Sequence, residues 1–86
     1  MEKQEFTDRY VVSRVLLSNN RDNRPAFIAD IKNRLYNQFF HNVNNRFKID
    51  NVVMVSTFET IILPHNQTVE YVLKGTVFYE QEDLLV

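Results

Sequence analysis

The two histidines are the side chains that could most readily hold a metal ion or transfer a proton near neutral pH. His41 falls on the polar face of a predicted helix, and His65 falls in a predicted turn. Neither has a second histidine or a carboxylate at the i,i+4 spacing that places two ligands on one helix face. The chain has no cysteine, which excludes zinc–thiolate sites, disulfides and thiol catalysis. We therefore expect no metal site and no cofactor.

Carboxylates in pairs are a second source of chemistry, because burial can separate their pKa values and permit general acid–base catalysis. Glu59 and Glu70 fall on the same face of a predicted β-hairpin, close to diagonal to each other. Lys74 lies on that face too, diagonal to Glu59. An ion pair at the surface is the simpler interpretation of these three residues.

The sequence also has no motif for an activated serine nucleophile and none for a phosphate-binding loop. Ser13, Ser18 and Ser56 have no adjacent base and lie in no nucleophile-elbow motif. The single glycine excludes the usual glycine-rich phosphate-binding loops. We expect a protein that is not an enzyme.

Four segments of the chain show regular hydrophobic patterns, and they predict one helix among three strands. Apolar and β-branched residues predict a first strand, whereas apolar residues at helical spacing after a polar turn predict the helix. The predicted elements are a strand over Phe6–Leu17, a turn over 18–23, a helix over Pro25–Asn44, a strand over Val52–Leu63 and a strand over Val69–Tyr79. Pro25 suits the first turn of a helix, where its missing N–H costs nothing.

The last two strands predict an antiparallel hairpin around the turn at 64–67. When Leu63 opposes Thr68, one face is almost wholly apolar and the other is half polar. A slip by one residue would place Glu59 in the core, so this register is favoured. On the apolar face, Phe58 opposes Leu73, and we expect both at the centre of the core beneath Leu35 or Phe39. Ser56 and Gly75 are also opposed there, leaving a notch of small residues that the helix can approach closely.

The predicted fold is α+β, a two-layer β-α-β-β arrangement with one helix packed on a three-stranded sheet and a C-terminal antiparallel hairpin. A right-handed crossover is expected for its strand–helix–strand unit. The 86 residues form a single domain, residues 1–86, with an acidic and then apolar tail over 80–86. This tail is either frayed or docked through Leu84, Leu85 and Val86 on a hydrophobic groove of its own dimer or of a partner. The element order resembles that of dodecin-like small proteins and of half a ferredoxin-like fold, and the resemblance is of element order only.

Apolar residues exceed what one core can use. Five residues of the helix form the face that should cover the sheet, and further aromatic residues flank that face. The second sheet face also carries apolar residues, with no second helix to cover them. The candidate oligomer or partner surface comprises Tyr36, Phe40, Val53, Val55, Ile61, Val72 and Phe78. These residues either cap the edges of the core or form an interface, most simply in a homo-oligomer joined face to face or edge to edge.

Charge is distributed unevenly along the chain. Residues 1–48 carry nine basic and five acidic side chains, whereas residues 49–86 carry one basic and six acidic ones. The candidate nucleic-acid surface in the first half comprises Arg21, Arg24, Arg34, Asn37, His41, Arg46 and Lys48. Nucleic-acid binders are usually basic overall, and this chain has a pI near 6.1. A solvated helix face with an Asp30–Arg34 ion pair is the plainer interpretation, so nucleic-acid binding is expected to be weak or absent.

Together these patterns predict a small non-catalytic interaction protein that self-associates and binds another macromolecule. The alternatives are a nucleic-acid-binding module and a small-ligand carrier formed in an oligomer, with Tyr36, Phe40 and Phe78 lining a shared pocket. No secretory signal and no membrane-spanning run is apparent, so a cytoplasmic protein without membrane contact is expected. The ten asparagines would suit an accessory protein of a phage or mobile element with an AT-rich genome.

Overall fold

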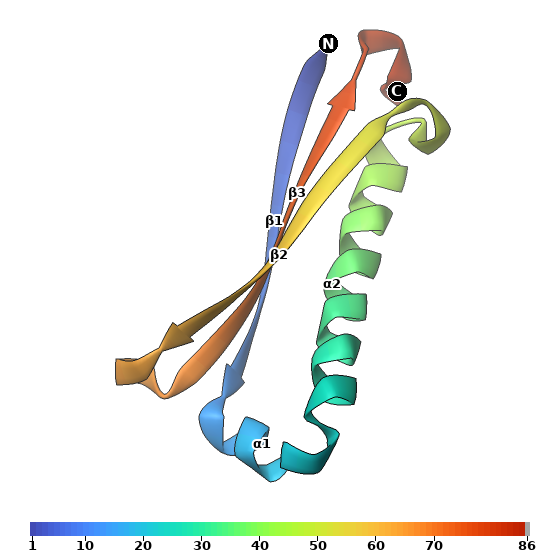
Figure 1. The fold of residues 1–86 in the computed structure, drawn as a ribbon. Helices are drawn as coiled ribbons and strands as arrows, with labels where there is room; N and C mark the ends of the chain where they lie inside the picture. The colour runs from blue at the N-terminus through green and yellow to red at the C-terminus, as the bar shows by residue number, and fades with distance from the viewer. Residues whose placement is uncertain (86) are drawn as a thin grey trace.

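The computed structural model describes residues 1–85, which form one long helix packed on a three-stranded sheet, an α+β fold (Figure 1). In chain order the helices and strands are β1 (Glu2–Ser13), α1 (Arg14–Asn19), α2 (Arg24–Arg46), β2 (Val53–Leu63) and β3 (Thr68–Tyr79). Four short 3-10 turns join or follow them. The predicted β-α-β-β order is matched only roughly, because α1 and these turns interrupt it.

The strand that comes last in the sequence lies in the middle of the sheet. The strand order is β1-β3-β2, and β3 is antiparallel to both neighbours. The predicted hairpin register is confirmed, with Leu63 opposite Thr68 and Phe58 opposite Leu73, although β2 begins at Val53, one residue later than expected. Both β1 and β2 are therefore edge strands.

The predicted first strand is wrong at both ends. β1 begins at Glu2 and ends at Ser13, so the run from Val15 to Leu17 belongs to α1 and not to the strand. The Ser13 side chain accepts a hydrogen bond from the Leu16 N–H (3.1 Å), which is the N-cap interaction that starts a helix. The turn lets Leu17 reach the core, while Val15 stays exposed. The prediction failed because the hydrogen bond from Leu16 to the Ser13 side chain starts a helix, although the residues Val15–Leu17 by themselves favour a strand.

The long helix follows the prediction closely. α2 spans Arg24–Arg46, against the expected Pro25–Asn44, and Pro25 lies in its first turn. The asparagines near its end do not stop it. Instead it ends where Phe47, in an extended conformation, donates its N–H to the Val43 carbonyl (2.9 Å) and buries its ring.

The core lies between α2 and the β1–β3 side of the sheet, because α2 packs mainly against these two strands and hardly against β2. Phe39 is 1% exposed, and a Cβ atom on Gly75 would come within 2.4 Å of its ring. The predicted notch is therefore real, and an aromatic ring fills it. Leu73 is buried as expected, but Phe58 is only half-buried and is not central, because α2 packs mainly on β1 and β3. The Lys32 ammonium group of α2 lies 5.5 Å from the centre of the Phe58 ring.

Candidate interaction surface

Edge strand β2 exposes apolar side chains on both of its faces. Val53 and Val55, on the face turned away from α2, are 56% and 52% exposed. Ile62, on the face turned toward α2, is 59% exposed although it opposes the buried Val69. This exposure follows from the position of α2, which packs mainly on β1 and β3. The outer side of β2 also offers unpaired backbone N–H and C=O groups along eleven residues.

The two edges of the sheet differ sharply in charge. β1 carries five charged residues in twelve, and one of them, Asp8, points inward because it opposes the buried Leu73. Charged and inward-pointing charged residues are common devices that prevent edge-to-edge pairing. β2 carries one charged residue in eleven, Glu59, whose carboxylate lies 3.4 Å from Lys74 Nζ. β1 is thus a protected edge, and β2 is an open one.

Val72 was predicted to be part of an open apolar surface, and this prediction is wrong. Charged side chains cover the centre of the outer sheet face, where Val72 lies. Val72 is only 1% exposed. It lies on the central strand between Glu70 and Lys74, which pair with Arg9 (3.4 Å) and Glu59 (3.4 Å) on the neighbouring strands. The predicted Glu59–Lys74 ion pair is therefore present, and the long side chains around Val72 cover it. Face-to-face packing here would remove four charges from water, which is costly.

The remaining residues of the predicted partner surface lie on two sides of β2. Val53, Val55, Ile61 and Phe78 share the outer sheet face, with Phe78 directly opposite Val53. Tyr36 and Phe40 lie on α2, on the other side of the sheet; the Ser56 hydroxyl donates to the Tyr36 hydroxyl (3.2 Å). Within one molecule the sheet separates Phe78 from Tyr36 and Phe40, so a pocket lined by all three would have to be shared between copies.

A groove that the sequence did not reveal opens beside the exposed end of β2. It has a volume of about 440 Å³ and an apolar floor that includes Ile28, Ile62 and Val69. Arg14, Arg24 and Tyr71 also line it. The residues come from α1, α2, β2 and β3, so only the folded chain brings them together. Its volume is within the range of small-ligand sites.

The titration of Tyr71, one of the groove residues, is shifted by its surroundings. Burial raises the pKa of the Tyr71 hydroxyl above its ordinary value of 10.0, and the nearby positive charge of Arg24 partly lowers it. The folded protein therefore favours the protonated phenol more strongly than the unfolded chain does. The resulting stabilisation is complete below the pKa of the unfolded state and is lost as the pH rises through the raised pKa of the folded state.

We expect this loss to be visible in a comparison with Tyr71→Phe. The free energy of unfolding, measured in urea, should fall more steeply with pH above about 10 in the wild type than in the variant. Below that pH the difference between the two proteins should be constant, because the phenol is protonated in both states. If the free energies of unfolding of the two proteins still differed by the same amount at about pH 11, the raised pKa of Tyr71 would be contradicted.

Among the predicted nucleic-acid residues, Arg24 has surroundings different from those of Arg34 and Arg46. Arg24 lines the groove beside β2, whereas the Arg34 and Arg46 guanidinium groups lie over β1 aromatic rings, 6.0 Å from the centre of Tyr10 and 5.4 Å from that of Phe6. Arg34 makes this contact with Tyr10, and within residues 1–85 no ion pair joins it to Asp30. The others, Arg21, Asn37, His41 and Lys48, are exposed on the turn before α2, on α2 and after it.

The acidic tail docks on its own chain as far as the structure describes it. The Lys48 N–H donates to the Asp83 carbonyl (2.7 Å), and the Leu85 N–H donates to the Arg46 carbonyl (2.9 Å). Leu84 bridges to Phe47 between these bonds. The tail to residue 85 is thus part of the fold, and the proposed docking of Val86 lies outside the described residues.

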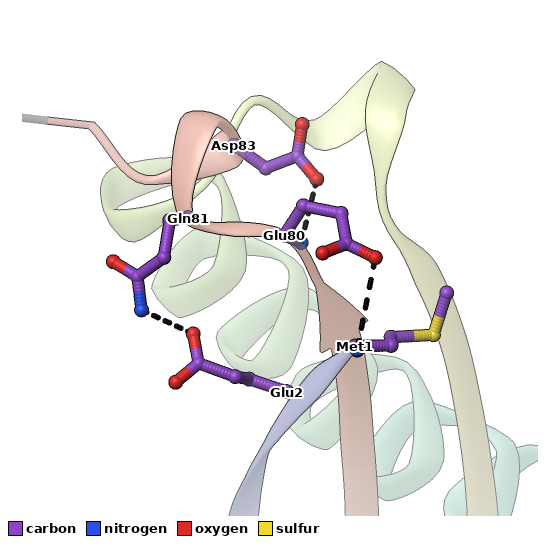
Figure 2. Close-up of polar contacts among 5 residues, drawn as sticks. All are labelled: Met1, Glu2, Glu80, Gln81 and Asp83. Carbon is purple, nitrogen blue, oxygen red and sulfur yellow. Dashed lines mark hydrogen bonds and ion pairs between the residues drawn. The ribbon is translucent and has the colours of Figure 1, made fainter.

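Two acidic side chains of this segment are used to form its turn (Figure 2). The Asp83 carboxylate accepts a hydrogen bond from the Glu80 N–H (2.9 Å), and the Glu80 side chain caps the same turn in return. The amino group of Met1 lies 3.8 Å from Glu80, and Gln81 donates to Glu2. The turn therefore also fastens the start of β1 beside the end of β3.

Across residues 1–85, no three His, Asp or Glu side chains gather in the way a metal site requires. No helix of this part of the chain is both long and apolar enough to cross a membrane. Comparisons of the chain with protein-family models, with curated proteins and with solved structures found no match.

Proposed function

We propose that the protein is a small, non-catalytic interaction protein that self-associates along β2 and binds another macromolecule in the associated form. The observation that carries this proposal is the open edge of β2, which has one charge in eleven residues and exposed apolar side chains on both faces. Such an edge is a template for pairing with another strand. A second copy of the chain is the simplest partner, because it always brings an equally open edge.

Two features of the rest of the surface support this choice of edge. The outer sheet face is crossed by the Arg9–Glu70 and Glu59–Lys74 ion pairs, and the β1 edge is charged. The basic residues that would serve a nucleic acid are divided between the groove and the β1 side of α2. Neither set offers a partner an apolar surface comparable to that of β2.

Replacement of Val55 with lysine should separate the copies. Sedimentation of the wild type at about micromolar concentration should show a dimer or a larger species. Val55→Lys should raise the dissociation constant at least about tenfold, equivalent to ~1.4 kcal/mol, because the pairing would bury or crowd an ammonium group. Val11→Lys is the matched control, since Val11 is 55% exposed on the β1 edge, and it should leave association unchanged.

A wild-type protein that remains monomeric at this concentration, with no dependence on concentration, would contradict the proposal. If Val11→Lys and Val55→Lys weakened self-association equally, the contact between copies would not be specific to the β2 edge.

A further inference from the structure

We infer that two copies join as an antiparallel β2–β2 pair with Phe58 on the two-fold axis, forming a six-stranded sheet with one α2 helix toward each end. This inference rests on the proposed self-association and adds the register of the interface. It starts from a property of the strand itself. The sequence of β2 matches its own reversed copy in residue type when the two are aligned over their full length.

The outer sheet face shows the match. In this register Val53 opposes Leu63 of the second copy, Val55 opposes Ile61, and Thr57 opposes Glu59. The strand therefore brings apolar residues against apolar residues at both ends of the pair and keeps its polar residues in the middle. Opposed apolar pairs of this kind stabilise a sheet.

The face turned toward α2 shows the same symmetry. Met54 opposes Ile62 of the second copy, Ser56 opposes Thr60, and Phe58 opposes its own equivalent. Met54 of the second copy thus lies beside Ile62, the most exposed of the large apolar β2 side chains and part of the groove lining. The pairing supplies a cover for the residue that α2 leaves bare.

Neighbouring registers match poorly. An axis at Thr57 would oppose Val55 to Glu59 and Met54 to Thr60. An axis at Glu59 would place two Glu59 carboxylates directly opposite each other, which is destabilising. With the axis at Phe58 each Glu59 opposes a threonine, and its charge is already balanced by Lys74 of its own chain.

The hydrogen-bonding pattern of an antiparallel pair is compatible with this register. Alternate residues of an edge strand direct their N–H and C=O groups outward. In a pair centred on Phe58, even-numbered residues oppose even-numbered ones and odd oppose odd. The outward groups of one copy therefore always meet outward groups of the other.

The chain has no cysteine, so introduced thiols can test the register directly. Val55→Cys and Ile61→Cys are prepared separately with tags of different size, mixed, allowed to exchange subunits and treated with a short bifunctional thiol reagent. The mixture should give a cross-linked heterodimer as its main product, because positions 55 and 61 are opposed. Each variant alone should give little, because two copies of position 55 would lie about 20 Å apart. Val11→Cys, on the β1 edge, is the control and should not cross-link.

The possible results separate the register from the self-association. If Val55→Cys alone cross-links as well as the mixture, the inferred register is wrong, although a dimer in sedimentation would still support the proposed function. If Val11→Cys cross-links best, the interface is on β1 and the inference fails. If the wild type is monomeric, both the register and the proposed function fail.

Discussion

Phe39→Ala should lower the free energy of unfolding by about 3–5 kcal/mol, a large part of the stability of a domain of this size. The Phe39 ring is 1% exposed, lies over Gly75 and contacts the ring of Phe6, with 5.8 Å between the ring centres. Its removal leaves a cavity between α2 and the sheet that neither element can close, because both are held by many other contacts. Urea unfolding followed by circular dichroism measures the change.

The neighbouring phenylalanine is a matched control for this effect. Phe40 is 42% exposed, and its ring stacks with the rings of Tyr36 and Phe39. Phe40→Ala should cost less, about 1–2 kcal/mol, since only part of the apolar area of Phe40 is buried. Both variants are compared at one protein concentration, because self-association adds to apparent stability. Similar losses in the two variants would show that α2 is rotated relative to the sheet.

Gly75→Ala should also be damaging, with an expected cost of about 1–3 kcal/mol. The new Cβ atom would lie 2.4 Å from one atom of the Phe39 ring and 2.8 Å from another, closer than any real contact. Either the ring leaves its position or α2 moves away from β3. Alanine is ordinarily preferred to glycine within a strand, so a loss of stability would come from the contact of the added methyl group with Phe39.

The same pair of residues provides an internal test. If the damage arises from the Phe39 ring, Gly75→Ala should cost less in a Phe39→Leu background than in the wild type, since the smaller side chain leaves room for the methyl group. The double-mutant cycle in urea measures this coupling. Additive losses would indicate that Gly75 is required for a reason other than the close approach of Phe39.

The hairpin register was predictable because the two faces of β2 and β3 differ in polarity along their whole length. A one-residue slip would bury Glu59, and so the alternation leaves one acceptable pairing. The long helix was predictable for a similar reason, since its apolar residues recur over many turns. Patterns that extend over ten or more residues carry enough information to outweigh local exceptions.

Features that depend on a few contacts were not predictable in the same way. The start of α1 depends on one capping bond from Ser13, in a segment whose residues otherwise favour a strand. The strand order depends on β1 pairing with β3 and not with β2, which no local pattern specifies. One signal was present, however: Tyr71, Val72 and Leu73 are consecutive apolar residues, as expected of a strand covered on both faces, and all three are buried.

The candidate interaction surface was likewise predictable only in part. The sequence indicated that Val53, Val55 and Ile61 lie together on one sheet face, because strand alternation places them there. The exposure of Ile62 and the closure over Val72 were missed. The first follows from the displacement of α2 toward β1, and the second from ion pairs that join all three strands. Both require the assembled sheet and cannot be inferred from one strand.

The central position of β3 has a consequence for how the chain acquires its fold during synthesis. The two strands that flank β3 in the sheet, β1 and β2, both precede it in the sequence and have no hydrogen bonds to each other. A nascent chain that has emerged only as far as Leu63 therefore contains two strands without a partner, one of them the sparsely charged β2. Sheet formation must wait until residues 68–79 have left the ribosome, and β2 is exposed to other chains throughout that interval.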